Sequence, residues 1–156
     1  MAKNGYTIEL LNIEDFNKCQ NIWDLKNNSE TAKKFYNQLK EGNRKTFICK
    51  NLNGEFIAEI SLVFKKPINE FTIEGKRVYI SHLTVKPELC GKGIGTSLCN
   101  YIFDYCKKLG YCEISLAVLL NNYNAIRLYH RLGFNKLIAV DKDEDGKYIG
   151  LLKTLD

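Results

Sequence analysis

Apolar and polar residues alternate along the chain in short segments that predict both strands and helices. Runs of apolar and β-branched residues predict strands at residues 6–11, 45–51, 55–64, 78–85, 113–119, 134–140 and 148–155. Stripes with helical spacing predict helices after Asn12, after Ser29, over residues 96–109 and from Ala125 to Leu132. This order is typical of an α+β fold, with a mixed sheet that has a parallel element near residue 90 and antiparallel edges.

Two turns are predicted from local chemistry. Asn53-Gly54 lies between two strand-like runs and predicts a hairpin in which both turn residues adopt positive φ. The segment "DKDEDG" at residues 141–146 begins like a calcium-binding loop, but the twelfth position of that motif is Leu152, where a bidentate Glu is needed. We therefore expect an acidic hairpin turn there and no metal site.

Composition narrows the class of protein. The 156 residues are 45% hydrophobic and 26% charged, which predicts one folded domain over residues 1–156. The net charge of +5 suits an anionic ligand, but it is spread along the chain and does not favour nucleic acid. Six cysteines without metal-ligand spacing, and no apolar run near ~20 residues, predict free thiols, a cytoplasmic location and no membrane contact.

The stretch "LTVKPELCGKGIGTS" (residues 83–97) carries the strongest chemical signal. Its glycine loop, which we define as Cys90 to Thr96, leaves a predicted strand and opens a predicted helix, a geometry that suits phosphate groups. The loop lacks the GxxxxGK[ST] spacing of a Walker loop and the GxGxxG spacing of a dinucleotide fingerprint. A turn that is glycine-rich for conformational reasons alone is the remaining alternative.

Two segments together resemble the GNAT superfamily of acyl-coenzyme A transferases. They are "LTVKPELCGKGIGTSLCNYIF" and "NNYNAIRLYHRLGF", which lie in the family's order within residues 78–135. The resemblance implies a mixed, mostly antiparallel central sheet of 6–7 strands flanked by about four helices, with residues 1–65 on the acceptor side. It implies transfer of an acetyl group from acetyl-CoA to a primary amine by direct attack in a ternary complex.

Other readings of the same residues stay open. A noncatalytic module that binds or senses coenzyme A is the main alternative, and a nucleotide-binding protein is the second. The amine acceptor is expected to be a small molecule or a peptide, and a homodimer is among the assemblies expected. The sequence does not choose between acceptors.

The resemblance also implies which residues contact coenzyme A. The pyrophosphate is assigned to the backbone amides of the glycine loop, and the pantetheine arm to the preceding strand, which binds it as an added strand. The residues are Leu83, Thr84, Val85, Cys90, Gly91, Lys92, Gly93, Ile94, Gly95, Thr96, Asn122 and Tyr129. One position departs from the pattern, because Cys90 stands where the family usually has Arg or Gln, and Lys92 supplies charge without bidentate geometry.

Catalysis needs a proton source near sulfur and a base for the amine. Tyr129 matches the tyrosine that the family places at the sulfur, and Asn122, or Asn121 if the register shifts by one, matches an asparagine on the cofactor arm. His82 is the candidate base with the best intrinsic pKa. The alternatives are Tyr79, Ser81 and the carboxylate Glu59.

Overall fold

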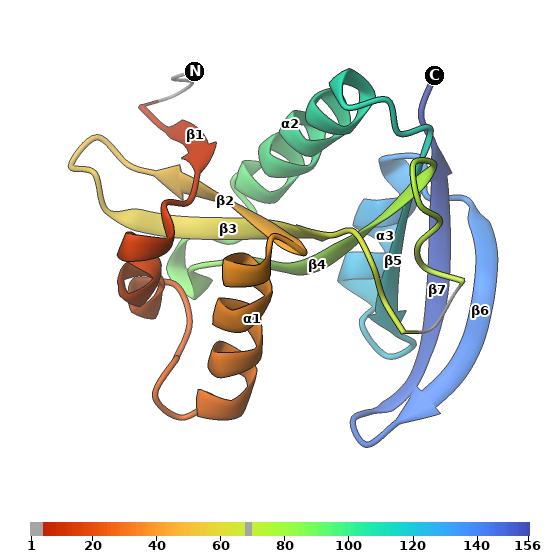
Figure 1. The fold of residues 1–156 in the computed structure, drawn as a ribbon, viewed down its shortest axis with the longest axis horizontal. Coiled ribbons are helices and arrows are strands. Elements are labelled where there is room, and N and C mark those ends of the chain that lie inside the picture. Colours follow the sequence, from red (N-terminus) through yellow and green to blue (C-terminus); the bar gives the residue numbers. More distant parts are fainter. Residues whose placement is uncertain (1–4, 68–69) are drawn as a thin grey trace. The chain divides into compact units, whose positions relative to one another are not determined.

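The protein is described here by a computed structural model that covers residues 5–67 and 70–156 (Figure 1). Its strands form one seven-stranded sheet in the order β1-β2-β3-β4-β5-β7-β6. The strands are β1 (Thr7–Leu10), β2 (Arg44–Lys50), β3 (Phe56–Val63), β4 (Arg77–Val85), β5 (Glu113–Leu119), β6 (Lys136–Asp143) and β7 (Gly146–Thr154). The helices are the 3₁₀ segments η1 (Ile13–Asn21) and η2 (Pro87–Leu89), and α1 (Ser29–Glu41), α2 (Ile94–Lys108) and α3 (Tyr123–Arg131).

Strand pairing confirms the predicted fold class. β1 pairs with β2, β5 with β7, and β6 with β7, all antiparallel, whereas β4 and β5 run parallel. The parallel ladder joins Arg77–Tyr79 to Glu113–Ser115, and β4 continues beyond it to Val85. The protein therefore has the expected α+β fold with a mixed, mostly antiparallel sheet.

The chain divides into two compact units. The first contains residues 1–62 and 81–101, and the second contains residues 63–80 and 102–156.

In the first unit, the helix predicted after Asn12 forms as the 3₁₀ helix η1. Phe16 and Cys19 are buried within this 3₁₀ helix, and the buried Ile22 is its C-cap. The predicted cap is confirmed, because the Asn12 side chain accepts a hydrogen bond from the Glu14 N–H at 3.1 Å.

The loop between β2 and β3 corrects one prediction. Gly54 has a φ of 78°, as expected, but Asn53 does not adopt positive φ. The Asn51 side chain accepts hydrogen bonds from the backbone N–H groups of Asn53 and Glu55, both at 3.0 Å. The turn is therefore stabilised by Asn51, and only Gly54 needs the left-handed conformation.

The second unit contains the acidic hairpin. β6 and β7 are the adjacent blue strands in Figure 1, and their pairing extends to Asp143 and Gly146, so the strands run further into the acidic segment than predicted. Phe134 was expected in a strand, but it precedes β6 and is 1% exposed, with its ring 5.8 Å from that of Tyr129. Phe134 was placed in a strand because it is apolar, but it is apolar because its ring is buried in the core.

Within residues 5–67 and 70–156, no helix is long and apolar enough to cross a membrane. The same ranges contain no group of three or more His, Cys, Asp or Glu side chains that could hold a metal ion. All six cysteines are free.

Candidate active site

The glycine loop joins β4 to α2 in the first unit. α2 begins at Ile94, two residues before the predicted start, and the Ser97 N–H donates to the Gly93 carbonyl at 3.0 Å. The N–H groups of Ile94, Gly95 and Thr96 therefore precede the hydrogen-bonded ladder of the helix. They are the unpaired donors at a positive helix end, which is the geometry that binds an anion.

The three glycines of this loop differ in whether the backbone conformation requires glycine. Gly91 and Gly93 have φ of 80° and 85°, and a Cβ atom at either position would meet nothing within 4 Å. Their backbone conformation requires glycine, and the space beside them is open. Gly95 does not have positive φ, and a Cβ there would lie 3.9 Å from Leu83 and 4.0 Å from Val85, an ordinary contact. The fold therefore does not require glycine at position 95.

The first position of the loop is exposed. Cys90 follows η2, its N–H donates to the Pro87 carbonyl, and its thiol lies 3.6 Å from the Lys86 carbonyl oxygen. Lys92 is also exposed. The two positions thus offer one small thiol and one cationic side chain beside the open glycines.

His82 interrupts the extended conformation of β4. Its φ is 60°, and it is the one non-glycine residue with positive φ among residues 5–67 and 70–156. Such a conformation costs on the order of 1 kcal/mol and needs support from its surroundings. The imidazole ring lies edge-on to the rings of Trp23 and Phe35, with centroid distances of 4.6 Å and 5.2 Å.

The irregular backbone brings neighbouring side chains into one cluster. Adjacent residues of a regular strand point to opposite faces. Here Ser81 accepts a hydrogen bond from Arg44 Nη2 at 2.9 Å, and the Arg44 guanidinium lies 3.7 Å from the centroid of Phe35, the ring that also contacts His82. We refer to Trp23, Phe35, Arg44, Glu59, Ser81 and His82 as the Glu59 cluster.

Glu59 is the buried carboxyl group of this cluster. It lies in β3, is 3% exposed, and its Oε1 accepts a hydrogen bond from the Trp23 indole N–H at 2.9 Å. Burial raises the pKa of Glu59 to about 7, although hydrogen bonds from Trp23 and Cys19 and the charge of Arg44 act in the opposite direction. At neutral pH this carboxyl group is therefore able both to accept and to release a proton.

His82 lies directly beside that carboxyl group. Its Nε2 is 3.8 Å from Glu59 Oε2, and it is a buried nitrogen without a hydrogen-bond partner in the described part of the chain. Burial and the charge of Arg44 lower the pKa of His82 to about 4. The imidazole is then neutral at pH 7, so this contact joins a neutral ring to a titrating carboxyl group and is not an ion pair at that pH.

Three other residues predicted for the site, Tyr79, Asn122 and Tyr129, lie in the second unit. Tyr129 belongs to α3 and packs edge-on against Phe134. Asn122 is the N-cap of α3, and its Oδ1 accepts a hydrogen bond from the Ala125 N–H at 3.2 Å. Tyr79 packs against Phe71 at 5.1 Å. The roles of Tyr129 and Asn122 in binding or catalysis stay predictions.

The sequence reasoning missed part of the Glu59 cluster. Trp23 and Phe35 follow Asn12 and Ser29, where the sequence predicts only helices, and Arg44 lies one residue before the strand predicted at residues 45–51. The signal that points to them is Glu59 itself, since it is the only charged residue in the apolar strand "FIAEISLV". A carboxyl group in a buried strand needs hydrogen-bond donors and compensating charge from neighbouring elements.

Known proteins resemble this chain in sequence and in fold. An uncharacterized N-acetyltransferase of Methanocaldococcus jannaschii is 32% identical over 115 residues, which are 66% of this chain and 50% of that protein. The chain thus spans about half the length of that curated relative.

Two solved structures share the fold. The ribosomal-protein-S18-alanine N-acetyltransferase from Escherichia coli has a TM-score of 0.76 at 21% identity, covering 97% of this chain and 94% of that one. An aminoglycoside 6'-N-acetyltransferase complexed with coenzyme A has a TM-score of 0.73 at 15% identity, covering 96% and 97%. The model of the Acetyltransferase (GNAT) family matches residues 10–134, well over half of the sequence, and the chain therefore belongs to that family.

Proposed function

We propose that the protein transfers an acetyl group from acetyl-CoA to a primary amine by direct attack in a ternary complex. The observation that carries this proposal is the buried carboxyl group of Glu59, whose pKa of about 7 lies in the working range of a general base. It contacts His82, on the strand that leads into the glycine loop. A binding module would not need such a proton acceptor.

The amine must lose a proton before it can attack. A primary ammonium has a pKa near ~10.4, so a nearby base has to remove the proton in or before the transition state. Glu59 is the better base, because His82 with a pKa of about 4 binds a proton weakly at pH 7. We assign proton acceptance to Glu59 and positioning of the proton path to His82, whose side chain is 23% exposed against 4% for Glu59.

Acetyl-CoA, when bound, supplies the activated thioester. The amides of the glycine loop hold the pyrophosphate, and the backbone of Leu83, Thr84 and Val85 pairs with the pantetheine arm. Gly95 supports this assignment, because its ordinary backbone does not require glycine, and the open space beside Gly91 and Gly93 leaves room for a closely approaching ligand. Tyr129 is assigned the proton that neutralises the leaving thiolate.

Thiol release across an amine panel tests the proposal. With acetyl-CoA and peptide amines, amino acids, polyamines and aminoglycosides as acceptors, at least one class should give thiol release in proportion to acetylated amine. Binding of acetyl-CoA without thiol release from any of them would favour a noncatalytic module. Stronger competition by ATP or NAD than by coenzyme A would favour a nucleotide-binding protein.

Substitution of loop glycines tests where the pyrophosphate binds. Gly95→Val keeps an ordinary backbone φ but places a branched side chain where phosphate approaches, so coenzyme A affinity should fall more than tenfold, about 1.4 kcal/mol. Gly93→Val should lower coenzyme A affinity by as much, and its φ of 85° should add backbone strain. Titration calorimetry measures both. Gly42→Val is the matched control, since Gly42 also has positive φ and open space but caps α1. Unchanged affinity in a folded Gly95→Val protein would remove the loop from the site.

A charge added at the first loop position should strengthen binding. Cys90→Arg places a guanidinium where the family usually has Arg or Gln, and coenzyme A should bind more tightly by roughly 1–2 kcal/mol through a charge-assisted contact. The gain should shrink at high salt. Cys112→Arg, at the other exposed cysteine, controls for net charge. Equal effects from the two variants at low salt would mean that position 90 has no specific phosphate contact.

A further inference from the structure

We propose that the second unit contains a binding pocket for an organic ammonium ion. The pocket has a volume of about 360 Å³ and is lined by Lys66, Phe71, Tyr79, Asp143, Asp145 and Tyr148 together with the end of β5. Its size falls in the range of small-molecule sites, roughly 300–1,000 Å³. The proposal does not rest on acetyl transfer, because all of its evidence lies within residues 63–80 and 102–156.

The aromatic wall of the pocket already holds an ammonium group. Phe71 and Tyr79 pack edge to face with ring centroids 5.1 Å apart. The Lys66 Nζ lies 4.2 Å from the Tyr79 centroid and 5.9 Å from the Phe71 centroid. Both distances are within the ~6 Å limit for cation–π attraction. The chain's own lysine thus shows how a ligand ammonium would lie on this wall.

The lining of the pocket also includes acidic residues. Asp143 at the end of β6 and Asp145 in the hairpin turn contribute two carboxylates, against one cation from Lys66. Among these three side chains, the carboxylates outnumber the ammonium group by one. The same field acts on Tyr148, whose pKa is raised by partial burial and by the charges of Asp141, Asp143 and Glu70. A second cation in the pocket would neutralise this excess.

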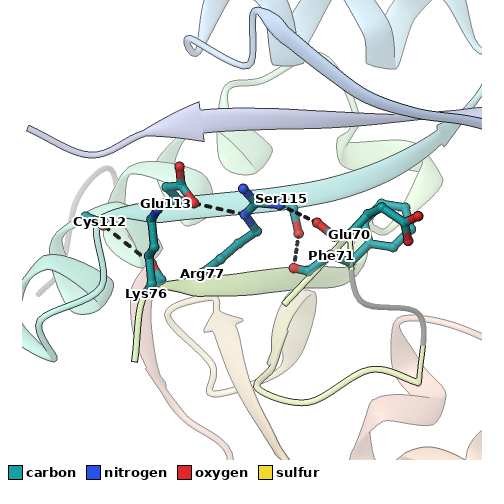
Figure 2. A network of polar contacts seen from close by, with 7 residues as sticks. All are labelled: Glu70, Phe71, Lys76, Arg77, Cys112, Glu113 and Ser115. Atoms are coloured by element: carbon teal, nitrogen blue, oxygen red, sulfur yellow. Dashed lines mark hydrogen bonds and ion pairs between the residues drawn. The ribbon is translucent and has the colours of Figure 1, made fainter. Parts of the chain in front are cut away.

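The wall is fixed by a hydrogen-bond network, shown in Figure 2. The Ser115 hydroxyl donates to the Phe71 carbonyl, and Arg77 Nη1 donates to the Glu70 carbonyl, each at 2.5 Å. Arg77 is itself held by Glu113, with its Nε 2.9 Å from Glu113 Oε1. These bonds attach the segment that carries Phe71 to β4 and β5.

Two more contacts fix the pocket residues. The Lys66 N–H donates to Thr72 Oγ1 at 3.1 Å, which anchors the backbone of the lysine. A Cβ at Gly150 would lie 2.8 Å from Phe71 Cε1, so the ring rests directly on the β7 backbone. A preformed aromatic wall binds a cation without paying to order its own side chains.

The ligand class follows from these features. A flat or apolar body fits the aromatic wall, and an ammonium head fits between the rings and the carboxylates. Lys66 competes with that head for the Tyr79 ring, so its removal should strengthen binding. Because removal of a lysine near any acidic surface also favours cation binding, the comparison with a lysine outside the pocket distinguishes the proposed site from a generally acidic surface.

Calorimetry with benzyltrimethylammonium tests the proposal, because this cation cannot accept an acetyl group. Lys66→Met should tighten its binding at least threefold, and Asp143→Asn and Tyr79→Leu should each weaken it at least threefold. Lys108→Met and Asp104→Asn, exposed residues of α2 in the same unit, should leave affinity unchanged. No binding to the parent protein at millimolar concentration, or effects equal to those of the controls, would overturn the proposal.

Competition then identifies the source of the cation. If benzyltrimethylammonium competes with benzylamine in thiol release, the pocket belongs to the acceptor site. If it binds without competing, the pocket takes a separate effector cation. Both outcomes uphold the pocket, and absence of acetyl transfer would not affect the binding result.

Discussion

Replacement of Glu59 by Gln is expected to lower kcat by about 10²–10⁴, the usual effect of removing a general base. The amide can still accept the hydrogen bond from the Trp23 indole that the carboxyl group accepts at 2.9 Å. Only the capacity to take a proton is lost. Coenzyme A affinity should not change, because the glycine loop is untouched.

The pH dependence of the rate identifies the base. Because the base must be deprotonated, the parent rate should fall as pH drops below about 7, the pKa of Glu59. This fall in rate at acidic pH should be absent in Glu59→Gln. Glu55→Gln, an exposed acid beside the same strand, is the control and should keep it. A fall in rate near pH 4 that persists in Glu59→Gln would identify His82 as the base. A fall in rate that follows the pKa of each acceptor would mean that the pH dependence comes from the amine itself.

Stability should respond in the opposite direction to activity. The pKa of Glu59 is raised from 4.5 to about 7 on folding, so between these values the folded protein binds more protons than the unfolded chain. The free energy of unfolding therefore falls as pH rises through this window. Glu59→Gln does not suffer this loss, so at pH 8 it should melt no lower than the parent. Loss of both activity and stability at pH 8 would indicate a structural role for the carboxylate.

Replacement of Tyr129 by Phe should also lower kcat by about 10²–10⁴, with little change in substrate binding. The substitution keeps the ring that packs against Phe134 at 5.8 Å and removes only the hydroxyl group. The leaving thiolate would then lack its assigned proton donor. Thiol release under saturating acetyl-CoA and acceptor measures the effect.

A matched tyrosine in the same helix controls for this change. Tyr123 is 70% exposed, and Tyr123→Phe should keep full activity. If Tyr129→Phe stays within threefold of the parent, its hydroxyl contributes under ~0.7 kcal/mol to the barrier, and water or another group protonates the sulfur. Measurement across pH guards against a slow product release that would hide the chemical step.

The fold could be predicted from the sequence where local patterns determine it. The glycines after β4, the apolar strand of residues 113–119 and the acidic hairpin were all identified because their signals lie within a few residues. The 3₁₀ form of η1 was missed because Phe16, Cys19 and Trp23 follow one another at spacings of three and four residues, which predict a helix but do not distinguish its type.

The candidate site was harder to predict, because its chemistry depends on tertiary contacts. Nothing local to Glu59 shows that an indole donates to it or that burial raises its pKa to about 7. The positive φ of His82 likewise has no signal in "VYISHLTV", since β-branched neighbours favour a regular strand. Such conflicts between local preference and structure are typical of functional sites.

A single turnover with acetyl-CoA carrying a labelled acetyl group tests direct transfer to an amine most directly. Mass spectrometry of the protein and of an accepted amine, quenched during the turnover, should find the label on acetyl-CoA and on the amine, with one thiol released for each amine acetylated. The protein, including the exposed thiols of Cys90 and Cys112, should carry none. Label retained on the protein before the amine is added, or no label transferred to any amine, would contradict direct transfer.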